Sequence, residues 1–204
     1  MKRTKFIFST LLVICSSLLF TSCDDLLNDF NTFEMDLGEV SFNIPIELDP
    51  NSSSLSSSQL NNIRTDVVSF SGNSGPISLQ SDMFKDLREY SNSPITLLVS
   101  GVKIRVTTTS ESGRMIRDFT ATTTGTVEKL VYQKEDPIYI ETDFVDPELT
   151  EYMKEVFLAI QDNKTVSIDV AGLTDIIPSE TEETDVTTIS IIPRLKAEIK
   201  ITKG

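Results

Sequence analysis

A strict alternation of apolar and polar residues after position 39 constrains the fold more than any other feature of this chain. The apolar positions are Val40, Phe42, Ile44, Ile46 and Leu48, and the residues between them are Ser41, Asn43, Pro45 and Glu47. Successive side chains of a β-strand point to opposite faces, so the pattern predicts a strand with one buried face. Because proline cannot donate a hydrogen bond to a neighbouring strand, Pro45 predicts that this strand lies at an edge.

Similar patterns recur along the rest of the chain. They predict strands at residues 65–70, 77–79, 95–108, 116–124, 126–133, 138–144, 165–173 and 186–201. The serine-rich segment Asp49–Asn62 has no such periodicity and predicts an exposed loop.

Two segments have helical periodicity. Residues 81–90 predict a short helix capped by Ser81 or Asp82, with one apolar face formed by Met83, Phe84, Leu87 and Tyr90. In the segment DPELTEYMKEVFLAIQDN, Asp146 can cap a second helix and Pro147 suits its first position. The apolar stripe of this helix consists of Leu149, Tyr152, Met153, Val156, Phe157 and Ile160. We expect the stripe to pack on a sheet, and a ligand-binding face is the alternative.

These elements together predict a mainly β fold. We expect a β-sandwich of about eight antiparallel strands with two short connecting α-helices. One internal similarity is also present: Asn92–Val102 and Asn163–Leu173 each follow a predicted helix and align without gaps. The similarity indicates either an internal duplication or two unrelated alternating strands, and the sequence leaves both open.

The first 22 residues have the composition of a secretory signal. Lys2, Arg3 and Lys5 are followed by the uncharged run 6–20 and then by the small pair 21–22. A transmembrane anchor is the alternative, but spanning the hydrocarbon layer takes roughly 20 apolar residues. We therefore predict a signal peptide at residues 1–22.

The number of cysteines limits the roles that a thiol can have after the signal is removed. Cys15 and Cys23 are the two cysteines of the chain, and cleavage before Cys23 would leave one thiol at the new N-terminus. One thiol forms no internal disulfide. A structural zinc site takes about four Cys or His ligands, and the chain contains no histidine.

The residues Phe20–Cys23, FTSC, resemble the lipobox of bacterial lipoproteins. In that family the cysteine after a small residue is acylated and becomes the first residue. The resemblance implies that Cys23 is lipidated. From the length and the strand pattern of the remaining chain we expect residues 23–32 to form a tether and residues 33–204 a single β-sandwich domain. The two or three acyl chains that such lipoproteins carry would anchor the protein to a bilayer without spanning it.

Asp24 and Asp25 follow the cysteine directly. In small envelope lipoproteins of the Bacteroides type, which this chain resembles, acidic residues at this place resemble a surface-export signal. In enteric-type bacteria an aspartate there resembles an inner-membrane retention signal instead. We expect an exported protein that is lipid-anchored to the outer membrane and faces the cell surface.

The charge of the remaining chain excludes one class of partner. Removal of residues 1–22 takes away three cations, so 18 basic and 31 acidic residues become 15 and 31, a net charge of −16. Such a domain is repelled by nucleic-acid phosphates and by anionic lipid headgroups. We expect no nucleic-acid partner and a membrane contact through the acyl chains alone.

Few catalytic arrangements remain without histidine. Ser-His, Cys-His and His-metal sites are absent, and no motif for a cofactor is present. Glu141 and Asp143 would lie on one side of the predicted strand 138–144, about 6.6 Å apart, near the spacing of an inverting glycosidase. Solvated surface carboxylates are the simpler interpretation.

The acidic segment Asp175–Asp185 contains Glu180, Glu182 and Glu183. Carboxylate oxygens could hold a divalent cation loosely, but we expect a solvated loop and no metal. The predicted function is therefore a non-enzymatic binding or structural module of the cell envelope, which displays this loop and Asp49–Asn62 to a protein or glycan partner. The alternatives are a carrier of an apolar ligand and, more remotely, a carboxylate-based glycoside hydrolase.

Overall fold

Ten antiparallel strands form one continuous sheet in the computed structural model, which describes residues 32–57, 64–110, 113–125, 129–176 and 186–201. The elements in chain order are β1 (Thr32–Glu39), β2 (Phe42–Ser57), β3 (Arg64–Asn73), η1 (Asp82–Tyr90), β4 (Ile95–Thr108), β5 (Met115–Gly125), β6 (Val131–Lys134), β7 (Ile138–Tyr139), β8 (Phe144–Val145), α2 (Pro147–Gln161), β9 (Val166–Thr174) and β10 (Thr187–Lys200). The predicted signal peptide and Cys23 lie outside the described residues.

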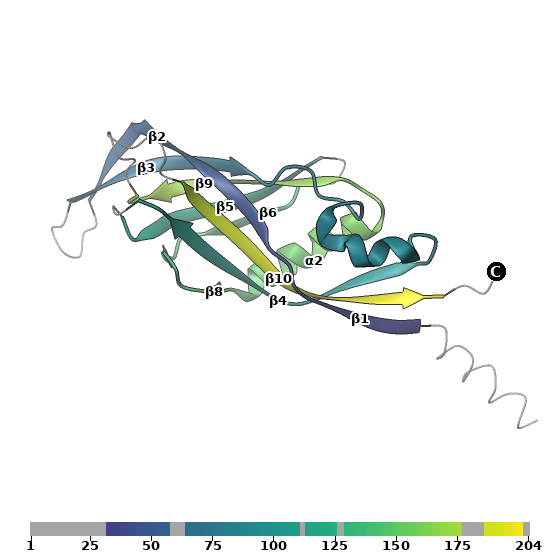
Figure 1. Ribbon diagram of the computed structural model, residues 1–204. Helices are drawn as coiled ribbons and strands as arrows, with labels where there is room; N and C mark the ends of the chain where they lie inside the picture. Colours follow the sequence, from purple (N-terminus) through teal and green to yellow (C-terminus); the bar gives the residue numbers. More distant parts are fainter. Residues whose placement is uncertain (1–31, 58–63, 111–112, 126–128, 177–185, 202–204) are drawn as a thin grey trace, which may run out of the picture.

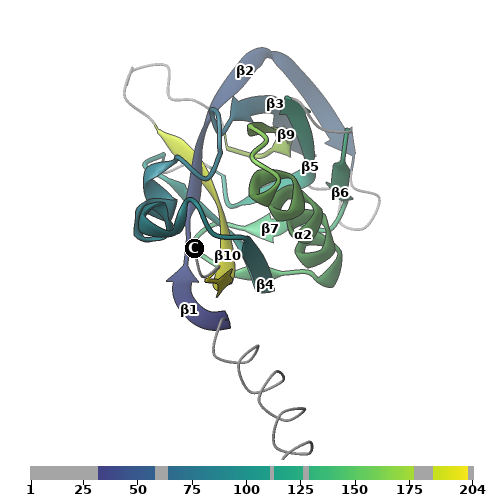
Figure 2. The ribbon, with the colours of Figure 1, turned by 90° about the vertical axis from the view of Figure 1, so that its right-hand side faces the viewer.

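The sheet curls into an open half-barrel. Its strand order is β6-β5-β9-β3-β2-β10-β4-β8, with β1 paired to β10 and β7 paired to β5. Helix α2 lies in the opening and contacts β4, β6 and β9 (Figures 1 and 2). The predicted mainly β fold with two helices is confirmed, and β2 and β10 join the strands into a single curled sheet.

The apolar stripe of α2 forms the centre of the core. All six residues predicted for the stripe are buried. The ring of Phe157 lies 5.9 Å from that of Phe42 on β2 and 6.2 Å from that of Phe84 on η1. The stripe therefore packs α2 against both the sheet and η1, and the prediction that it packs on the sheet is confirmed.

Asp146 anchors the start of α2, as its sequence position predicts. Its Oδ1 accepts a hydrogen bond from the Glu148 N–H at 2.8 Å, and its Oδ2 accepts one from the Tyr132 hydroxyl at 3.1 Å. Lys134 Nζ lies 3.1 Å from the same Oδ2. Burial acts to raise the pKa of Asp146, but the bonds from Glu148, Lys134 and Tyr132 outweigh it and hold this pKa below its ordinary value. The ionised carboxylate thus fixes edge strand β6 to the helix.

The first helix differs in type from the prediction, because η1 is a 3₁₀-helix. Its turns close between residues three apart, as in the bonds from the Phe84 N–H to the Ser81 carbonyl and from the Ser91 N–H to the Arg88 carbonyl. Phe84 has non-helical backbone angles and Ser81 makes no side-chain cap. The predicted apolar face is confirmed, since Phe84 and Leu87 are buried.

The alternation of β2 is confirmed, but its predicted edge position is wrong. Phe42, Ile44 and Ile46 are buried, whereas the residues between them are exposed. Strand β2 nevertheless lies between β3 and β10. Pro45 is in register with Thr188 of β10, but the pairing with β3 begins only at Ile46, so the missing N–H leaves the pairing with β3 intact.

The predicted loop Asp49–Asn62 is wrong for its first part. Residues 49–57 continue β2, and Ser54–Ser57 pair with β3 after a register shift that begins at Asp49. Ser52 stabilises the shift, because its Oγ accepts hydrogen bonds from the Ser69 N–H at 2.8 Å and the Ser69 hydroxyl at 2.7 Å. The Ser52 hydroxyl here takes the place of a backbone acceptor, so the strand continues through the shift. Residues 58–62 lie outside the described residues.

The sequence does not predict strand β1, and the predicted tether 23–32 is too long by one residue, because Thr32 begins this strand. Phe33, Met35 and Leu37 pack against the core, and this weak alternation is the signal that could have identified the strand. Thr32 pairs with Lys200 at the end of β10, so the chain enters the fold beside the end of its last strand (Figure 1).

The two segments that resemble each other in sequence occupy equivalent places. η1 ends two residues before Asn92, and α2 ends two residues before Asn163. Strands β4 and β9 then begin at the aligned residues Ile95 and Val166. In the sheet, β4 pairs with β10 and β5 pairs with β9. In each half of the chain a strand precedes the helix (β3 or β8) and two strands follow it (β4 and β5, or β9 and β10). The sheet contains these strands as two blocks of the same order, β5-β9-β3 and β10-β4-β8, which is consistent with an internal duplication.

Candidate functional site: a pocket between two helix ends

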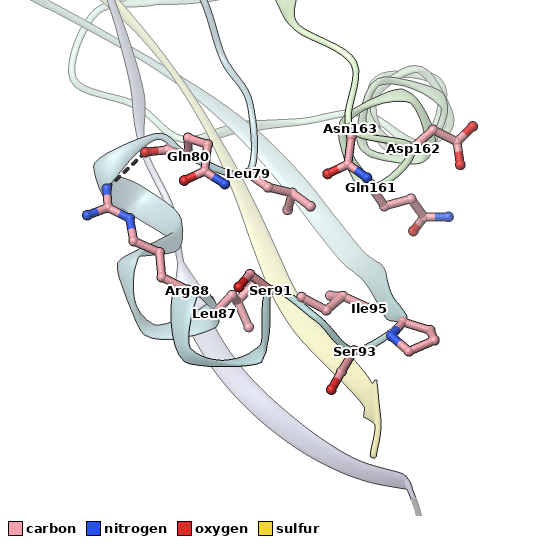
Figure 3. Close-up of a pocket in the computed structure, with 11 residues that line it drawn as sticks. Leu79, Gln80, Leu87, Arg88, Ser91, Ser93, Ile95, Gln161, Asp162 and Asn163 are labelled. Atoms are coloured by element: carbon pink, nitrogen blue, oxygen red, sulfur yellow. Dashed lines mark hydrogen bonds between the residues drawn. The ribbon is translucent and has the colours of Figure 1, made fainter. Parts of the chain in front are cut away.

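A pocket of about 260 Å³ lies between the end of η1 and the end of α2 (Figure 3). Its apolar lining consists of Leu79, Leu87, Pro94 and Ile95. Its polar lining consists of Gln80, Arg88, Ser91, Ser93, Gln161, Asp162 and Asn163. The pocket is therefore formed by the two equivalent helix-to-strand turns together with the segment that precedes η1.

The turn after η1 forms one side. The Ser93 N–H donates to the Tyr90 carbonyl at 2.8 Å, which closes the last 3₁₀ turn. The Pro94 carbonyl then accepts from the Lys200 N–H at 3.0 Å, where β4 begins beside the end of β10. The ring of Tyr90 lies 5.2 Å from that of Phe33 on β1, so η1 also rests on the first strand. This side of the pocket consequently lies at the end of the molecule where the chain enters the fold (Figure 1).

The turn after α2 forms the opposite side. Asn163 has a left-handed backbone, with φ of 59°, and its N–H donates to the Ile160 carbonyl at 3.0 Å. The Lys164 N–H returns to the Ala159 carbonyl at 3.2 Å. Asparagine tolerates this conformation, which is common at the end of a helix. The turn is therefore well defined, and the Asn163 carboxamide is presented at the pocket (Figure 3).

The Gln161 side chain is fixed by the sheet. Its Oε1 accepts a hydrogen bond from the Leu97 N–H at 3.0 Å. Strand β8 pairs with β4 only at Lys103 and Ile104, so the glutamine satisfies a backbone donor farther along that edge. Since the oxygen is bound to the strand, the amide nitrogen of Gln161 is left as a donor.

The two charged residues of the pocket each have an opposite charge nearby. Arg88 Nη2 donates to the Gln80 carbonyl at 2.9 Å and to Asp82 Oδ1 at 2.8 Å. Asp162 Oδ2 lies 3.8 Å from Lys164 Nζ. The pocket therefore combines aliphatic surface, neutral amides and hydroxyls with charges that are already compensated.

The single strand 138–144 that was predicted to carry the carboxylate pair is interrupted. Glu141 has a left-handed backbone, with φ of 60°, and the Thr142 N–H donates to the Tyr139 carbonyl at 3.3 Å. This turn separates β7 from β8, so Glu141 and Asp143 do not share one face of a strand. Both residues are exposed, as the simpler interpretation predicted.

Asp143 is instead part of an ion-pair network on the sheet. Its Oδ2 lies 3.2 Å from Lys103 Nζ, and its Oδ1 lies 2.6 Å from Arg105 Nη2. Lys103 also pairs with Glu39 at 3.0 Å. The hydrogen bonds from Lys103 and Arg105 hold the pKa of Asp143 below its ordinary value, although partial desolvation opposes them. A carboxylate held ionised in this way is unsuited to act as a general acid.

The acidic segment Asp175–Asp185 is described only at its start. Asp175 is buried, and its Oδ1 accepts hydrogen bonds from the Arg114 N–H at 2.7 Å and the Met115 N–H at 2.9 Å. This carboxylate therefore closes the turn before β5 and does not project into a loop. Residues 177–185, with the three glutamates of the proposed display loop, lie outside the described residues.

Two further pockets are also partly polar. One, of about 320 Å³ beside β7, includes Arg114 and Glu141 in its lining. Another, of about 290 Å³ between β6 and α2, includes Glu148, Glu151 and Glu155. The lining of the second also includes Leu130, Val131, Tyr132 and Tyr152, so it is partly apolar as well.

Sequence reasoning did not find the pocket between η1 and α2. The two turns that form it belong to the similar segments Asn92–Val102 and Asn163–Leu173, but their similarity does not indicate that they lie side by side.

Across the part of the chain that the structure describes, we find no helix that is both long and apolar enough to cross a membrane. Comparison with protein-family models and with curated proteins finds no match for this chain.

Proposed function

We propose that this protein is a lipid-anchored, non-enzymatic binding module of the bacterial cell envelope. In this proposal Cys23 carries the acyl chains, and the anchor is in the outer membrane with the domain at the cell surface. The partner is an envelope protein or a glycan.

The observation that carries the proposal is the position of the first strand. Thr32 pairs with Lys200 at one end of the elongated sheet, whereas the β2–β3 hairpin extends at the other end (Figure 1). Residues 23–31 can span at most about 30 Å, at roughly 3.3 to 3.6 Å per residue. A lipid on Cys23 would therefore hold the end with η1 near the membrane and direct the hairpin away from it.

Replacement of the anchor cysteine tests this proposal. We expect Cys23→Ala to abolish incorporation of labelled fatty acid and to release the chain from the outer-membrane fraction or leave it unprocessed. Cys15→Ala is the matched control, because it removes a cysteine from within the predicted signal and should leave labelling unchanged. Fatty-acid labelling that persists in Cys23→Ala would contradict the proposal.

The absence of catalysis belongs to the same proposal. The chain has no histidine, and the Asp143 carboxylate is engaged by Lys103 and Arg105. We expect no hydrolysis of glycan or peptide substrates by the purified protein. Turnover that disappears in Glu141→Gln or Asp143→Asn would show this expectation to be wrong.

A further inference from the structure

We propose that the pocket between η1 and α2 binds one neutral sugar unit, supplied either by a soluble glycan or by the headgroup of a glycolipid. This inference rests on the pocket and is independent of the lipid anchor. Small-molecule sites commonly have volumes of about 300 to 1,000 Å³, so a pocket of about 260 Å³ suits a single ring or a comparably small group.

The charges of the pocket favour a neutral ligand. The Arg88 guanidinium is compensated by Asp82 at 2.8 Å, and Asp162 is compensated by Lys164 at 3.8 Å. A phosphate or a carboxylate would have to compete with Asp82 for the guanidinium. A cationic ligand would have to compete with Lys164 for Asp162 in the same way.

The uncharged groups of the pocket match the hydroxyls of a sugar. Within the described part of the chain, the side chains of Gln80, Ser91, Ser93 and Asn163 make no hydrogen bond. Gln161 is bound through its oxygen to the Leu97 N–H, and its amide nitrogen makes no hydrogen bond there. Amides and serine hydroxyls can both donate and accept, as each hydroxyl of a sugar requires. Figure 3 shows these side chains on both sides of the pocket.

The apolar groups supply the complementary surface. Leu87 is buried, and Leu79 and Ile95 are partly buried against the core, so they form a rigid aliphatic surface between the polar groups. The C–H face of a sugar ring can lie on such a surface. No aromatic ring is among the lining residues. The ligand efficiency of drug-sized ligands, applied to a single hexose, gives a Kd in about the millimolar range.

Saturation-transfer NMR on the protein as it is isolated from cells, in detergent micelles, tests the proposal. The probes are methyl glucoside and N-acetylglucosamine, with glucuronate and inorganic phosphate as charged comparators. We expect transfer to at least one neutral probe and none to the charged ones. Preference for a charged probe, or no transfer to either neutral probe from solution or from vesicles that carry a hexose-headed glycolipid, would overturn the proposal.

Two isosteric variants locate the site. Gln161→Glu keeps the acceptor for Leu97 but removes the free donor, and Asn163→Asp keeps a residue that tolerates the left-handed turn. We expect either change to weaken binding at least about tenfold, with an unchanged melting temperature. Gln133→Glu on edge strand β6 makes the same chemical change elsewhere and should have no effect. Equal binding by all three variants would refute the assignment of the pocket.

A third variant guards against a folding defect in the first two. Ser91→Ala removes one hydroxyl from an exposed turn residue and adds no charge. If both isosteric variants lose stability, reduced binding by Ser91→Ala supports the site and unchanged binding contradicts it. Transfer to the soluble probes supports a glycan source, and transfer seen only with glycolipid vesicles supports a lipid headgroup source.

Discussion

Phe157→Ala is expected to lower the free energy of unfolding by about 3 to 5 kcal/mol, the range for truncation of a buried phenylalanine. Phe157 is fully buried, and its ring contacts Phe42 on β2 and Phe84 on η1. The truncation leaves a cavity at the point where the sheet and both helices meet, and the surrounding rings can fill it only in part. Urea denaturation followed by circular dichroism measures the loss.

The adjacent residue provides the control. Leu158 is 45 % exposed on the outer face of α2, so Leu158→Ala should change the stability by no more than about 0.5 kcal/mol. Similar losses of stability in Phe157→Ala and Leu158→Ala would mean that the two faces of the helix are buried to the same extent. An unchanged stability of Phe157→Ala would mean that the stripe faces solvent or a partner.

Gly172→Ala is expected to cost about 3 kcal/mol or more, at or beyond the usual upper limit for overpacking a protein core. Gly172 lies on β9 between Phe119 of β5 and Phe70 of β3. A Cβ at this position would overlap the Asp118 carbonyl oxygen and lie 2.9 Å from the Phe70 ring. The oxygen belongs to the backbone, so β5 would have to move away from β9 to relieve the overlap.

Gly101→Ala is the matched control, because it places the same substitution in β4. A Cβ at Gly101 would meet nothing within 4 Å, and its backbone is not in the left-handed region. We expect this variant to be as stable as the parent or slightly more stable, since alanine restricts the unfolded chain. Equal stability of Gly172→Ala and Gly101→Ala in thermal denaturation would contradict the close approach of β5 and β9.

Local periodicity identified most of the elements. The boundaries of β4 and the start of α2 at Pro147 agree with the sequence prediction, because both depend on neighbouring residues. The stripe of α2 and the alternation of β2 also identified the buried residues, since periods of 3.6 and 2 residues place side chains on one face regardless of what covers that face.

Partnership between distant segments was not predictable in the same way. Pro45 was placed at a sheet edge because its local chemistry disfavours a central strand, yet the pairing with β3 begins beyond it. Residues 49–57 read as a loop, yet Ser69 on β3 supplies partners to Ser52. Residues 138–144 read as one strand, yet the turn at Glu141 interrupts it. In each case the local structure depends on hydrogen bonds or a turn that form only when distant strands come together.

The sequence by itself determined the fold class, the two helical segments, the core face of each main element and the exclusion of histidine-based chemistry. These properties follow from periodicity and composition. Only the tertiary structure decided that the strands form one curled sheet, that Glu141 and Asp143 do not lie on one strand, and that the turns after η1 and α2 meet in a pocket. The physical reason is that a sheet edge and a pocket are formed by contacts between segments about 70 residues apart. A short-range sequence pattern does not determine which distant segment will bind a given backbone group or side-chain amide.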